Sequence, residues 1–266
     1  MYHIIASDLD GTLLSPNHTI TSFACDTLKL IAKRINFVFA TGRHHIDVIQ
    51  MRNRIGIQGY MITSNGARIH NAEGILMFSK NLDKDIVRDL YTLEYNKDIL
   101  MHVYDDHKWF IDGNSMSKKH SFVKPKLFNY QLVESKWLPT DGISKVFFTG
   151  NDPDHLLKME HVIEKRWTNR VNVSLSSPLC LEVMAGGVSK GHALKNVARI
   201  LNISLKKCIA FGDGMNDKEM LSIVGKGCIM ANAHPRLKKF LPELEVIGSN
   251  NEDAVPYTLR QIFLQN

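Results

Sequence analysis

The chain has 266 residues, of which 44% are hydrophobic and 23% charged, and its formal net charge is +6, values typical of a globular protein. No apolar run approaches the roughly 20 residues that cross a bilayer, and no signal-peptide layout precedes the first strand, so we expect a cytoplasmic protein without a membrane partner. The four cysteines are scattered and form no Cys-x-x-Cys pair, which favours reduced thiols over disulfides or a zinc site.

A short apolar run at residues 2–6 predicts a buried first strand. Asp8 and Asp10 follow it, and residues two apart on an extended chain point the same way. Both carboxylates can therefore face one point beyond the carboxyl end of the strand, which is where ligands bind in open α/β sheets. Two close carboxylates repel each other unless a cation or a proton intervenes, and such oxygen ligands suit Mg²⁺. The alternative interpretation of residues 8–12 is plain turn and cap chemistry.

Helix and strand patterns alternate over the next 70 residues or so, which predicts the opening of a doubly wound α/β domain. The elements are a helix capped by Thr21, strands at 37–40 and 60–64, and a hairpin of 67–70 and 75–78. The second strand ends in Thr41 and Gly42, a hydroxyl and a glycine that let backbone amides approach an anion closely. A simple strand-to-helix turn is the alternative there.

The pattern changes near residue 83, where paired strands mix with helices. Helices are predicted at 85–95 and 154–167, and strands at 100–104, 108–112, 143–149, 171–176 and 180–184. Residues 115–126 are polar and basic and fit either a loop or a poorly patterned helix. This mixture predicts a separate α+β module, residues 83–186, inserted into a domain formed by residues 1–82 and 187–266.

The α/β alternation resumes at Ser189, which can cap a helix that begins with Lys190. A lysine at that end opposes the helix dipole, and a bound anion would explain its presence. A buried strand at 208–211 then leads to Asp213, Asn216 and Asp217. The remaining elements are a helix around Met220, strands at 227–230 and 245–247 and a helix at 252–263.

Four groups of polar residues thus lie at strand ends or helix starts, with the insert between the second and the third. Their order resembles the haloacid dehalogenase superfamily of phosphohydrolases, and the insert resembles the C2 cap of its Cof-type subfamily. The signatures are Asp8-Leu-Asp-Gly-Thr-Leu-Leu14, Ala40-Thr-Gly-Arg43, Gly187-Val-Ser-Lys-Gly191 and Gly212-Asp-Gly-Met-Asn-Asp217. The resemblance covers essentially the whole chain and implies a doubly wound, Rossmann-like parallel-sheet core with an inserted α+β C2B cap.

The resemblance also implies a Mg²⁺-dependent phosphatase. Asp8 would be the nucleophile that forms an aspartyl-phosphate, and Asp10 the acid and base. The implied metal ligands are Asp8, the Asp10 carbonyl, Asp213 and Gly214. The implied phosphate-binding groups are Leu9, Thr41, Gly42, Lys190 and Asn216. Asp217 would orient Lys190 or the metal's waters, or else would interact with the helix dipole as a plain N-terminal acid.

Longer segments at residues 37–45, 61–68 and 180–194 are similar to phosphatases of this subfamily that act on pyridoxal 5′-phosphate and sugar phosphates. The chain departs from them mainly around residues 95–140. We therefore expect a small phosphorylated metabolite as the partner, and a monomer or weak homodimer.

Two other functions remain open at this point. A phosphomutase could use the same nucleophile, and a non-catalytic binder of a phosphometabolite or nucleic acid could retain the fold. The positive net charge would suit nucleic acid, but lysine and arginine are spread along the chain without an aromatic-interleaved stripe. A phosphate-bearing substrate explains the charge equally well, so no nucleic-acid partner is expected.

Overall fold

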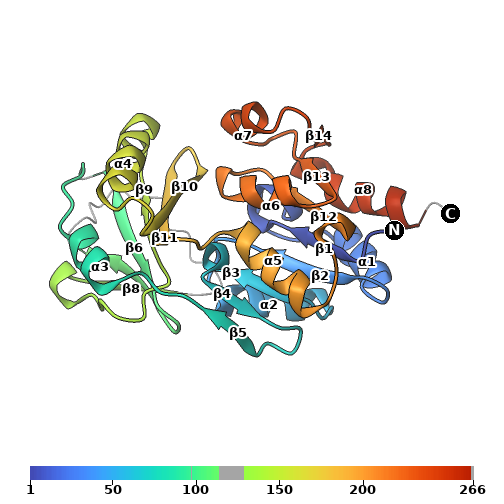
Figure 1. The fold of residues 1–266 in the computed structure, drawn as a ribbon, viewed down its shortest axis with the longest axis horizontal. Helices are drawn as coiled ribbons and strands as arrows, with labels where there is room; N and C mark the ends of the chain where they lie inside the picture. The colour runs from blue at the N-terminus through green and yellow to red at the C-terminus, as the bar shows by residue number, and fades with distance from the viewer. Residues whose placement is uncertain (97, 114–128, 265–266) are drawn as a thin grey trace. The chain divides into compact units, whose positions relative to one another are not determined.

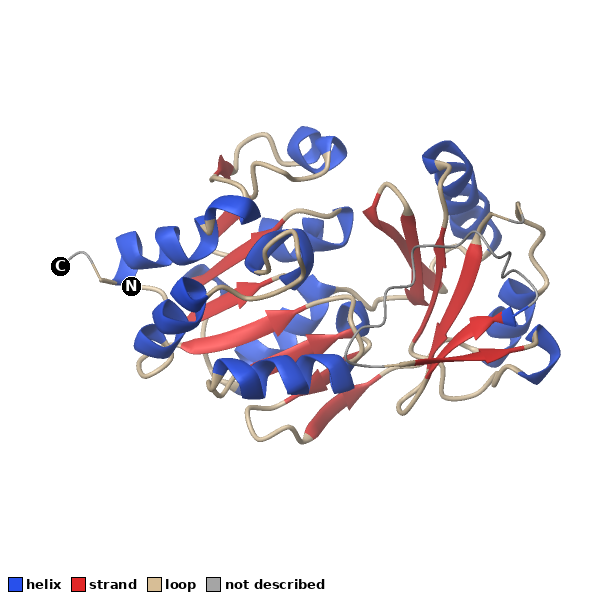
Figure 2. Cartoon of the chain, turned by 180° about the vertical axis from the view of Figure 1, so that it is seen from behind, coloured by secondary structure: helices blue, strands red, loops and turns tan. Residues whose placement is uncertain are grey.

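The computed structural model describes residues 1–96, 98–113 and 129–264 (Figures 1 and 2). The chain divides into two compact units, a core unit of residues 1–78 and 189–266 and an insert unit of residues 79–188. The boundaries predicted from sequence lay at 82/83 and 186/187. Within the described ranges, no helix is long and apolar enough to cross a membrane.

An eight-stranded sheet organises the core unit, in the order β14-β13-β12-β1-β2-β3-β4-β5. The strands are β1 (Ile4–Ser7), β2 (Asn36–Ala40), β3 (Tyr60–Thr63), β4 (Arg68–His70), β5 (Leu76–Ser79), β12 (Cys208–Gly212), β13 (Lys226–Ile229) and β14 (Glu245–Val246). The strands from β14 to β3 run parallel, and β4 is antiparallel to β3. This arrangement confirms the predicted doubly wound fold.

Strand β1 lies at the centre of this sheet, because Ile4 is paired with Asn36 of β2 on one side and with Cys208 of β12 on the other. All four of its residues are buried. Parallel strands end at the same edge of a sheet, so the segments after β1, β2 and β12 meet there.

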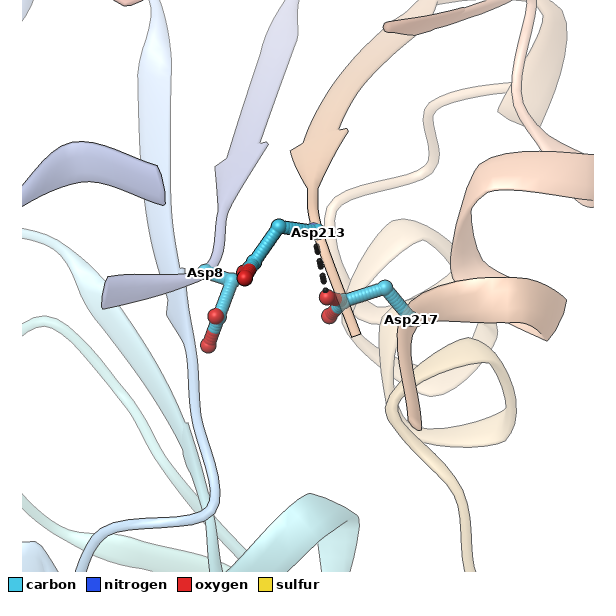
Figure 3. Close-up of side chains that lie close together, drawn as sticks. All are labelled: Asp8, Asp213 and Asp217. Atoms are coloured by element: carbon cyan, nitrogen blue, oxygen red, sulfur yellow. Dashed lines mark hydrogen bonds between the residues drawn. The ribbon is translucent and has the colours of Figure 1, made fainter. Parts of the chain in front are cut away.

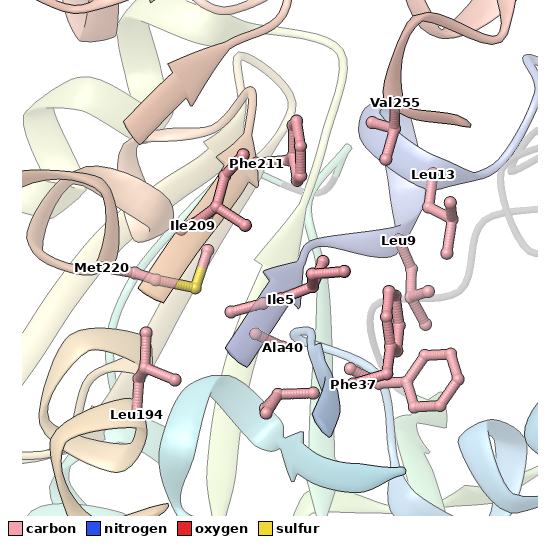
Figure 4. Packing of buried hydrophobic residues seen from close by; sticks show 14 of the residues in the cluster. Ile5, Leu9, Leu13, Phe37, Ala40, Leu194, Ile209, Phe211, Met220 and Val255 are labelled. Carbon is pink, nitrogen blue, oxygen red and sulfur yellow. The ribbon is translucent and has the colours of Figure 1, made fainter. Parts of the chain in front are cut away.

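Helices cover the sheet with apolar faces. They are α1 (Ser22–Ile31), α2 (His45–Ile55), α5 (Lys190–Ile200), α6 (Lys218–Ile223), α7 (Pro235–Phe240) and α8 (Ala254–Phe263). The short helical turns are η1 (Leu9–Leu13), η2 (Ser64–Gly66), η5 (Leu205–Lys207), η6 (Met215–Asp217) and η7 (Asn250–Glu252). Figure 4 shows residues of the central strands packed together with Leu194 of α5 and Val255 of α8, both fully buried.

The predicted helix caps are present. The Thr21 hydroxyl accepts the Ala24 amide at 3.0 Å, and the Ser189 hydroxyl accepts the His192 amide at 3.1 Å. These bonds satisfy amides that have no partner inside the helix and fix where each helix begins. The start of α5 matters most, because Lys190 is its first residue.

A six-stranded sheet with helices forms the insert unit, in the order β10-β11-β9-β6-β7-β8. The strands are β6 (Leu100–Tyr104), β7 (Trp109–Asp112), β8 (Tyr130–Val133), β9 (Lys145–Thr149), β10 (Val171–Ser177) and β11 (Cys180–Ala185). The helices are α3 (Lys84–Tyr91), α4 (Pro153–Arg166) and the turn η4 (Ser135–Trp137). Neighbouring strands are antiparallel except β7 and β8.

Some elements differ from the sequence expectation. Helix α3 ends at Tyr91 rather than at residue 95, and neither β8 nor α7 was predicted. Strand β8 has no buried residue and α7 buries only Leu237, so neither leaves a clear apolar pattern in the sequence. The predicted loop or helix at residues 115–126 lies wholly within 114–128, outside the described residues.

Candidate active site

Three carboxylates gather where β1 and β12 end (Figure 3). Asp8 directly follows β1, Asp213 directly follows β12, and Asp217 ends the turn η6. The Asp8 amide donates to the Phe211 carbonyl at 3.0 Å, which extends the pairing of the two strands up to the site. One oxygen from each carboxylate lies within 4.8 Å of the other two. Residues more than 200 positions apart in sequence therefore form one cluster.

Lys190 lies inside this cluster. Its Nζ donates to Asp8 Oδ1 at 2.7 Å and to Asp217 Oδ1 at 2.7 Å, and its side chain is fully buried. These two carboxylates explain how a lysine is tolerated at the first position of α5, where the helix dipole disfavours a positive charge. Two short bonds also hold the ammonium group at a fixed place beside Asp8.

Asp217 supports both Lys190 and the end of β12. While Oδ1 accepts from Lys190, Oδ2 accepts the amides of Asp213 and Gly214, each at 3.0 Å. Gly212 leaves the space for this, because a Cβ there would lie 2.5 Å from Asp217 Cβ. The contact with Lys190 is compatible with the predicted orienting role of Asp217, which stays a prediction. The Gly214 carbonyl accepts the Asp217 amide at 3.1 Å, and its predicted role as a metal ligand stays a prediction.

The cluster holds more negative charge than its lysine can balance. Burial raises the pKa of Asp8 well above its usual value, and although Lys190 lowers it, Asp217 and Asp213 raise it further. Burial and then Asp217 raise the pKa of Asp213 to about 7. Burial alone would lower the pKa of Lys190, but the carboxylates of Asp217 and Asp8 outweigh it and raise this pKa. Carboxylates that lack enough positive charge are suited to a cation.

The residues present fit a hard divalent cation. The donors are carboxylate oxygens, which Mg²⁺ prefers, and they belong to buried or half-buried side chains. The Thr12 hydroxyl donates to Asp213 Oδ1 at 2.9 Å and fixes the orientation of that carboxylate. Gly11, which has a φ of 81°, leaves room for the Asp213 carboxylate, because a Cβ on residue 11 would lie 2.2 Å from Asp213 Oδ2.

Asp10 has different surroundings from Asp8. Arg43 binds its carboxylate through two nitrogens, Nε to Oδ2 and Nη2 to Oδ1, both at 2.6 Å. His18 Nδ1 lies 2.8 Å from Oδ1, and Arg43 Nη1 also donates to Asp47 Oδ2 at 2.8 Å. The Asp10 side chain is 34% exposed, whereas that of Asp8 is 8% exposed. Asp10 is thus held in one orientation and remains open to solvent.

Sequence reasoning missed the part that Arg43, His18 and Thr12 play at this site. Two of the signatures contain Arg43 and Thr12, so the sequence indicated that these residues lie near the site. It did not indicate which residues they contact. Nothing in the sequence around His18 points to Asp10. Burial alone would lower the pKa of Arg43, but the bonds to Asp10 outweigh it and raise this pKa, in keeping with a tight ion pair.

The predicted phosphate-binding residues lie at the same edge of the sheet. Thr41 is buried, its amide donates to the Ile62 carbonyl at 2.9 Å, and its Oγ1 accepts the Arg43 amide at 3.1 Å. Gly42 follows it on the segment between β2 and α2. Asn216 Nδ2 donates to Asn65 Oδ1 at 3.0 Å. The Leu9 side chain is fully buried in the core, so only its backbone can serve a ligand.

Comparisons with known proteins agree with this architecture. Residues 5–259 match the haloacid dehalogenase-like hydrolase family. A protein of Buchnera aphidicola subsp. Schizaphis graminum, provisionally named a phosphatase, is 46% identical over 281 aligned residues, covering 100% of this chain and 97% of that protein. The HMP-PP phosphatase of Serratia proteamaculans is 39% identical, with 98% of this chain and 95% of that protein aligned.

A solved structure agrees as well. The crystal structure of a haloacid dehalogenase-like hydrolase from Bacteroides thetaiotaomicron is 26% identical and gives a TM-score of 0.81, covering 99% of this chain and 100% of that one. The match of the family extends over nearly the whole chain, insert included. The chain belongs to the haloacid dehalogenase-like hydrolases.

Proposed function

We propose that this hydrolase is a Mg²⁺-dependent phosphatase that acts on small phosphomonoesters, including pyridoxal 5′-phosphate and sugar phosphates. The observation that carries the proposal is the position of Asp8, buried at the end of the central strand with Lys190 2.7 Å from its Oδ1. A carboxylate oriented in this way, with its partner charge fixed, is suited to attack an electrophile rather than to serve only as a structural acid.

Asp8 attacks phosphorus and forms an aspartyl-phosphate, which water then hydrolyses. When bound by Asp8, Asp213 and the backbone at Asp10 and Gly214, Mg²⁺ supplies positive charge that offsets the repulsion between Asp8 and the substrate's phosphate. Lys190 keeps the Asp8 carboxylate in place and also attracts the phosphoryl oxygens. Asp217 holds Lys190 in its position through a 2.7 Å bond.

Asp10 acts as the acid and then as the base. It donates a proton to the leaving oxygen in the first step and removes a proton from water in the second. Its half-buried side chain is open enough to exchange protons with solvent between the steps. The Thr41 hydroxyl, the amides of Gly42 and Leu9 and the Asn216 side chain bind the phosphoryl oxygens. Phosphoryl transfer depends mainly on such positioning and on charge neutralisation.

Release of inorganic phosphate from a substrate panel, with and without Mg²⁺, tests the proposal. The panel contains pyridoxal 5′-phosphate, hexose and pentose phosphates, a nucleotide and an aryl phosphate, with HMP-PP added because a 39% identical relative bears that name. We expect Mg²⁺-dependent release, abolished by Asp8→Asn. Rearranged sugar phosphates without free phosphate would indicate a mutase. No release from folded, Mg²⁺-supplied protein would overturn the proposal.

A further inference from the structure

A buried loop after β3 has a backbone conformation that side chains rarely adopt. Ser64 and Asn65 have φ angles of 46° and 54°, and Gly66, which follows them, has a φ of 102°. All three residues are buried. Left-handed residues other than glycine persist where the surroundings hold them, and such strained residues cluster at functional sites. The proposed mechanism gives this loop no role.

The loop contacts all three segments that carry predicted phosphate-binding side chains. The Asn65 amide donates to the Thr41 carbonyl at 3.0 Å, and Asn65 Oδ1 accepts from Asn216 Nδ2 at 3.0 Å. Gly66 lies against the residue before Lys190, because a Cβ on it would lie 2.4 Å from the Ser189 carbonyl oxygen. Asn65, on the segment that follows β3, therefore links the segments that follow β2 and β12.

The bond between the two asparagines restricts the Asn216 side chain. A primary amide carries two hydrogens on one nitrogen, and here one of them is bound by Asn65. That bond fixes the plane of the amide, so the second hydrogen points in a set direction. Asn216 is 9% exposed, so it is buried but not fully enclosed.

We propose that Asn65 is a positioning residue for phosphate binding. Its side chain orients the Asn216 amide toward the phosphoryl oxygens, and its left-handed backbone brings that side chain to Asn216 while its amide stays on Thr41. The proposal rests on the proposed phosphatase function and deepens it, since Asn65 acts through Asn216 and does not itself react.

Asn65→Gly removes the side chain of residue 65 while keeping its backbone conformation, so it tests the side chain alone. Glycine accepts a φ of 54° without strain, so the variant should fold while losing the bond to Asn216. The matched control is Asn202→Gly, because Asn202 has a φ of 53°, is exposed and lies beyond the end of α5 opposite to Lys190. We expect Asn65→Gly to raise KM and the inhibition constant of inorganic phosphate about tenfold, as loss of one hydrogen bond to a bound anion does. We expect kcat to change less, and Asn202→Gly to match the wild type.

A double-mutant cycle distinguishes positioning from a merely structural role. If Asn65 acts through Asn216, then Asn65→Gly combined with Asn216→Ala should bind phosphate no more weakly than Asn216→Ala alone. Additive losses, or an unchanged inhibition constant in folded Asn65→Gly, would overturn the inference.

Two further outcomes are separable. Wild-type protein that releases no phosphate would refute the phosphatase itself, whereas active wild type with unaffected Asn65→Gly would refute only the positioning role. Thermal unfolding checks that each variant is folded. If Asn65→Gly does not fold, Asn65→Ser replaces it, because the neighbouring Ser64 shows that serine accepts a positive φ in this loop. Its hydroxyl is too short to reach Asn216, so the same tenfold loss is expected.

Discussion

Each unit of the molecule buries a lysine, and the two lysines have opposite surroundings. In the insert unit, Lys145 Nζ lies 2.5 Å from Glu182 Oε1, and the rings of Tyr104 and Phe147 lie 4.9 and 4.4 Å from it. Both charged side chains of this pair are nearly fully buried. In the core unit, Lys190 is bound by Asp8 and Asp217, and Asp213 stands beside them.

The difference lies in the balance of charge. The pair of Lys145 and Glu182 is neutral, whereas the cluster in the core has three carboxylates and one lysine. A neutral buried pair needs nothing from outside the protein, although it adds little stability. An unbalanced cluster must take up protons or a cation, and the raised pKa of Asp213, about 7, is the sign of this. We therefore interpret the first as structural and the second as functional.

The largest expected effect is that of Asp8→Asn. A carboxamide cannot attack phosphorus, so we expect turnover to fall at least about a thousandfold. The change also removes one negative charge from the cluster, so the metal-free variant should unfold at the same or a higher temperature than the wild type. Phosphate release and thermal unfolding measure both effects. Near-normal turnover would mean that the cluster has only a structural role, like the insert pair.

Replacement of each lysine by methionine tests the comparison directly. Lys190→Met leaves the carboxylates without their cation, and we expect a loss of about 3–5 kcal/mol in the free energy of unfolding, together with loss of turnover. Lys145→Met should cost a similar amount because it removes the cation that lies against the buried Glu182 carboxylate.

The double change Lys145→Met and Glu182→Met is the control. A buried ion pair replaced by apolar side chains is often neutral for stability, so we expect most of the loss to be recovered. Urea unfolding measures these differences. If the double variant is as unstable as Lys145→Met, the insert pair stabilises its unit in some way other than by mutual charge balance. The distinction between a charge-balanced insert pair and an unbalanced core cluster would then not explain the results.

Arg43→Lys tests how Asp10 is held. Lysine cannot form the two parallel bonds that Arg43 makes, so the Asp10 carboxylate should lose its fixed orientation. We expect kcat to fall about tenfold for an alkyl phosphate, whose leaving oxygen needs a proton, and less for an activated aryl phosphate.

The control for this change is Arg52→Lys. Arg52 lies on α2 and is buried like Arg43, but its Nη1 donates to the carbonyls of Gly59 and Ala72. We expect Arg52→Lys to leave the ratio of kcat for the alkyl phosphate to kcat for the aryl phosphate unchanged. If Arg43→Lys lowers kcat equally for both substrates, the change disturbs the site as a whole and does not act through the orientation of Asp10.

The smallest expected effect is a pH dependence of the thermal stabilisation by Mg²⁺. A carboxyl group whose pKa is raised by folding binds its proton more tightly in the folded state. Asp213 therefore stabilises the metal-free fold fully below the unfolded-state pKa of about 4, and this contribution is lost as pH rises through about 7. Mg²⁺ competes with that proton, so it should raise Tm by roughly 2–8 °C more at pH 8 than at pH 5.5.

Asp213→Asn should flatten this pH dependence, because the carboxamide does not titrate. Thermal unfolding with Mg²⁺ and with a chelator, from pH 5 to pH 8, gives the answer. An equal Mg²⁺ effect at all pH values would contradict the assignment of Asp213 as a ligand.

The core of the site is predictable because it depends on topology. Once residues 2–6 and 208–211 are recognised as parallel strands of one sheet, Asp8 and Asp213 must lie at the same edge, although the insert separates them in sequence. Lys190 was identifiable because its charge is unfavourable at a helix start. For Asp217, the sequence left two alternatives, and the structure shows a contact to Lys190 as well as to the amides that follow β12.

The contacts of long polar side chains were not predictable. Arg43 reaches Asp10 across the gap between two strand ends, and His18 reaches the same carboxylate from the segment before α1. Neither contact leaves a periodic or spaced pattern, because each depends on the direction of one side chain rather than on the backbone. The left-handed conformation of Ser64 could not be predicted from the sequence either, because serine has no preference for it.

The central position of β1 has a consequence for the synthesis of the protein. Its neighbour β2 follows soon after it, but its other neighbour, β12, leaves the ribosome only after the whole insert has been made. Domains form as the chain emerges from its N-terminal end. Asp8 is therefore made before the insert, whereas Lys190 and Asp213 are made after it. The nascent chain thus carries Asp8, the proposed nucleophile, well before Lys190 and Asp213, and the proposed hydrolysis must await synthesis of the segments that follow the insert.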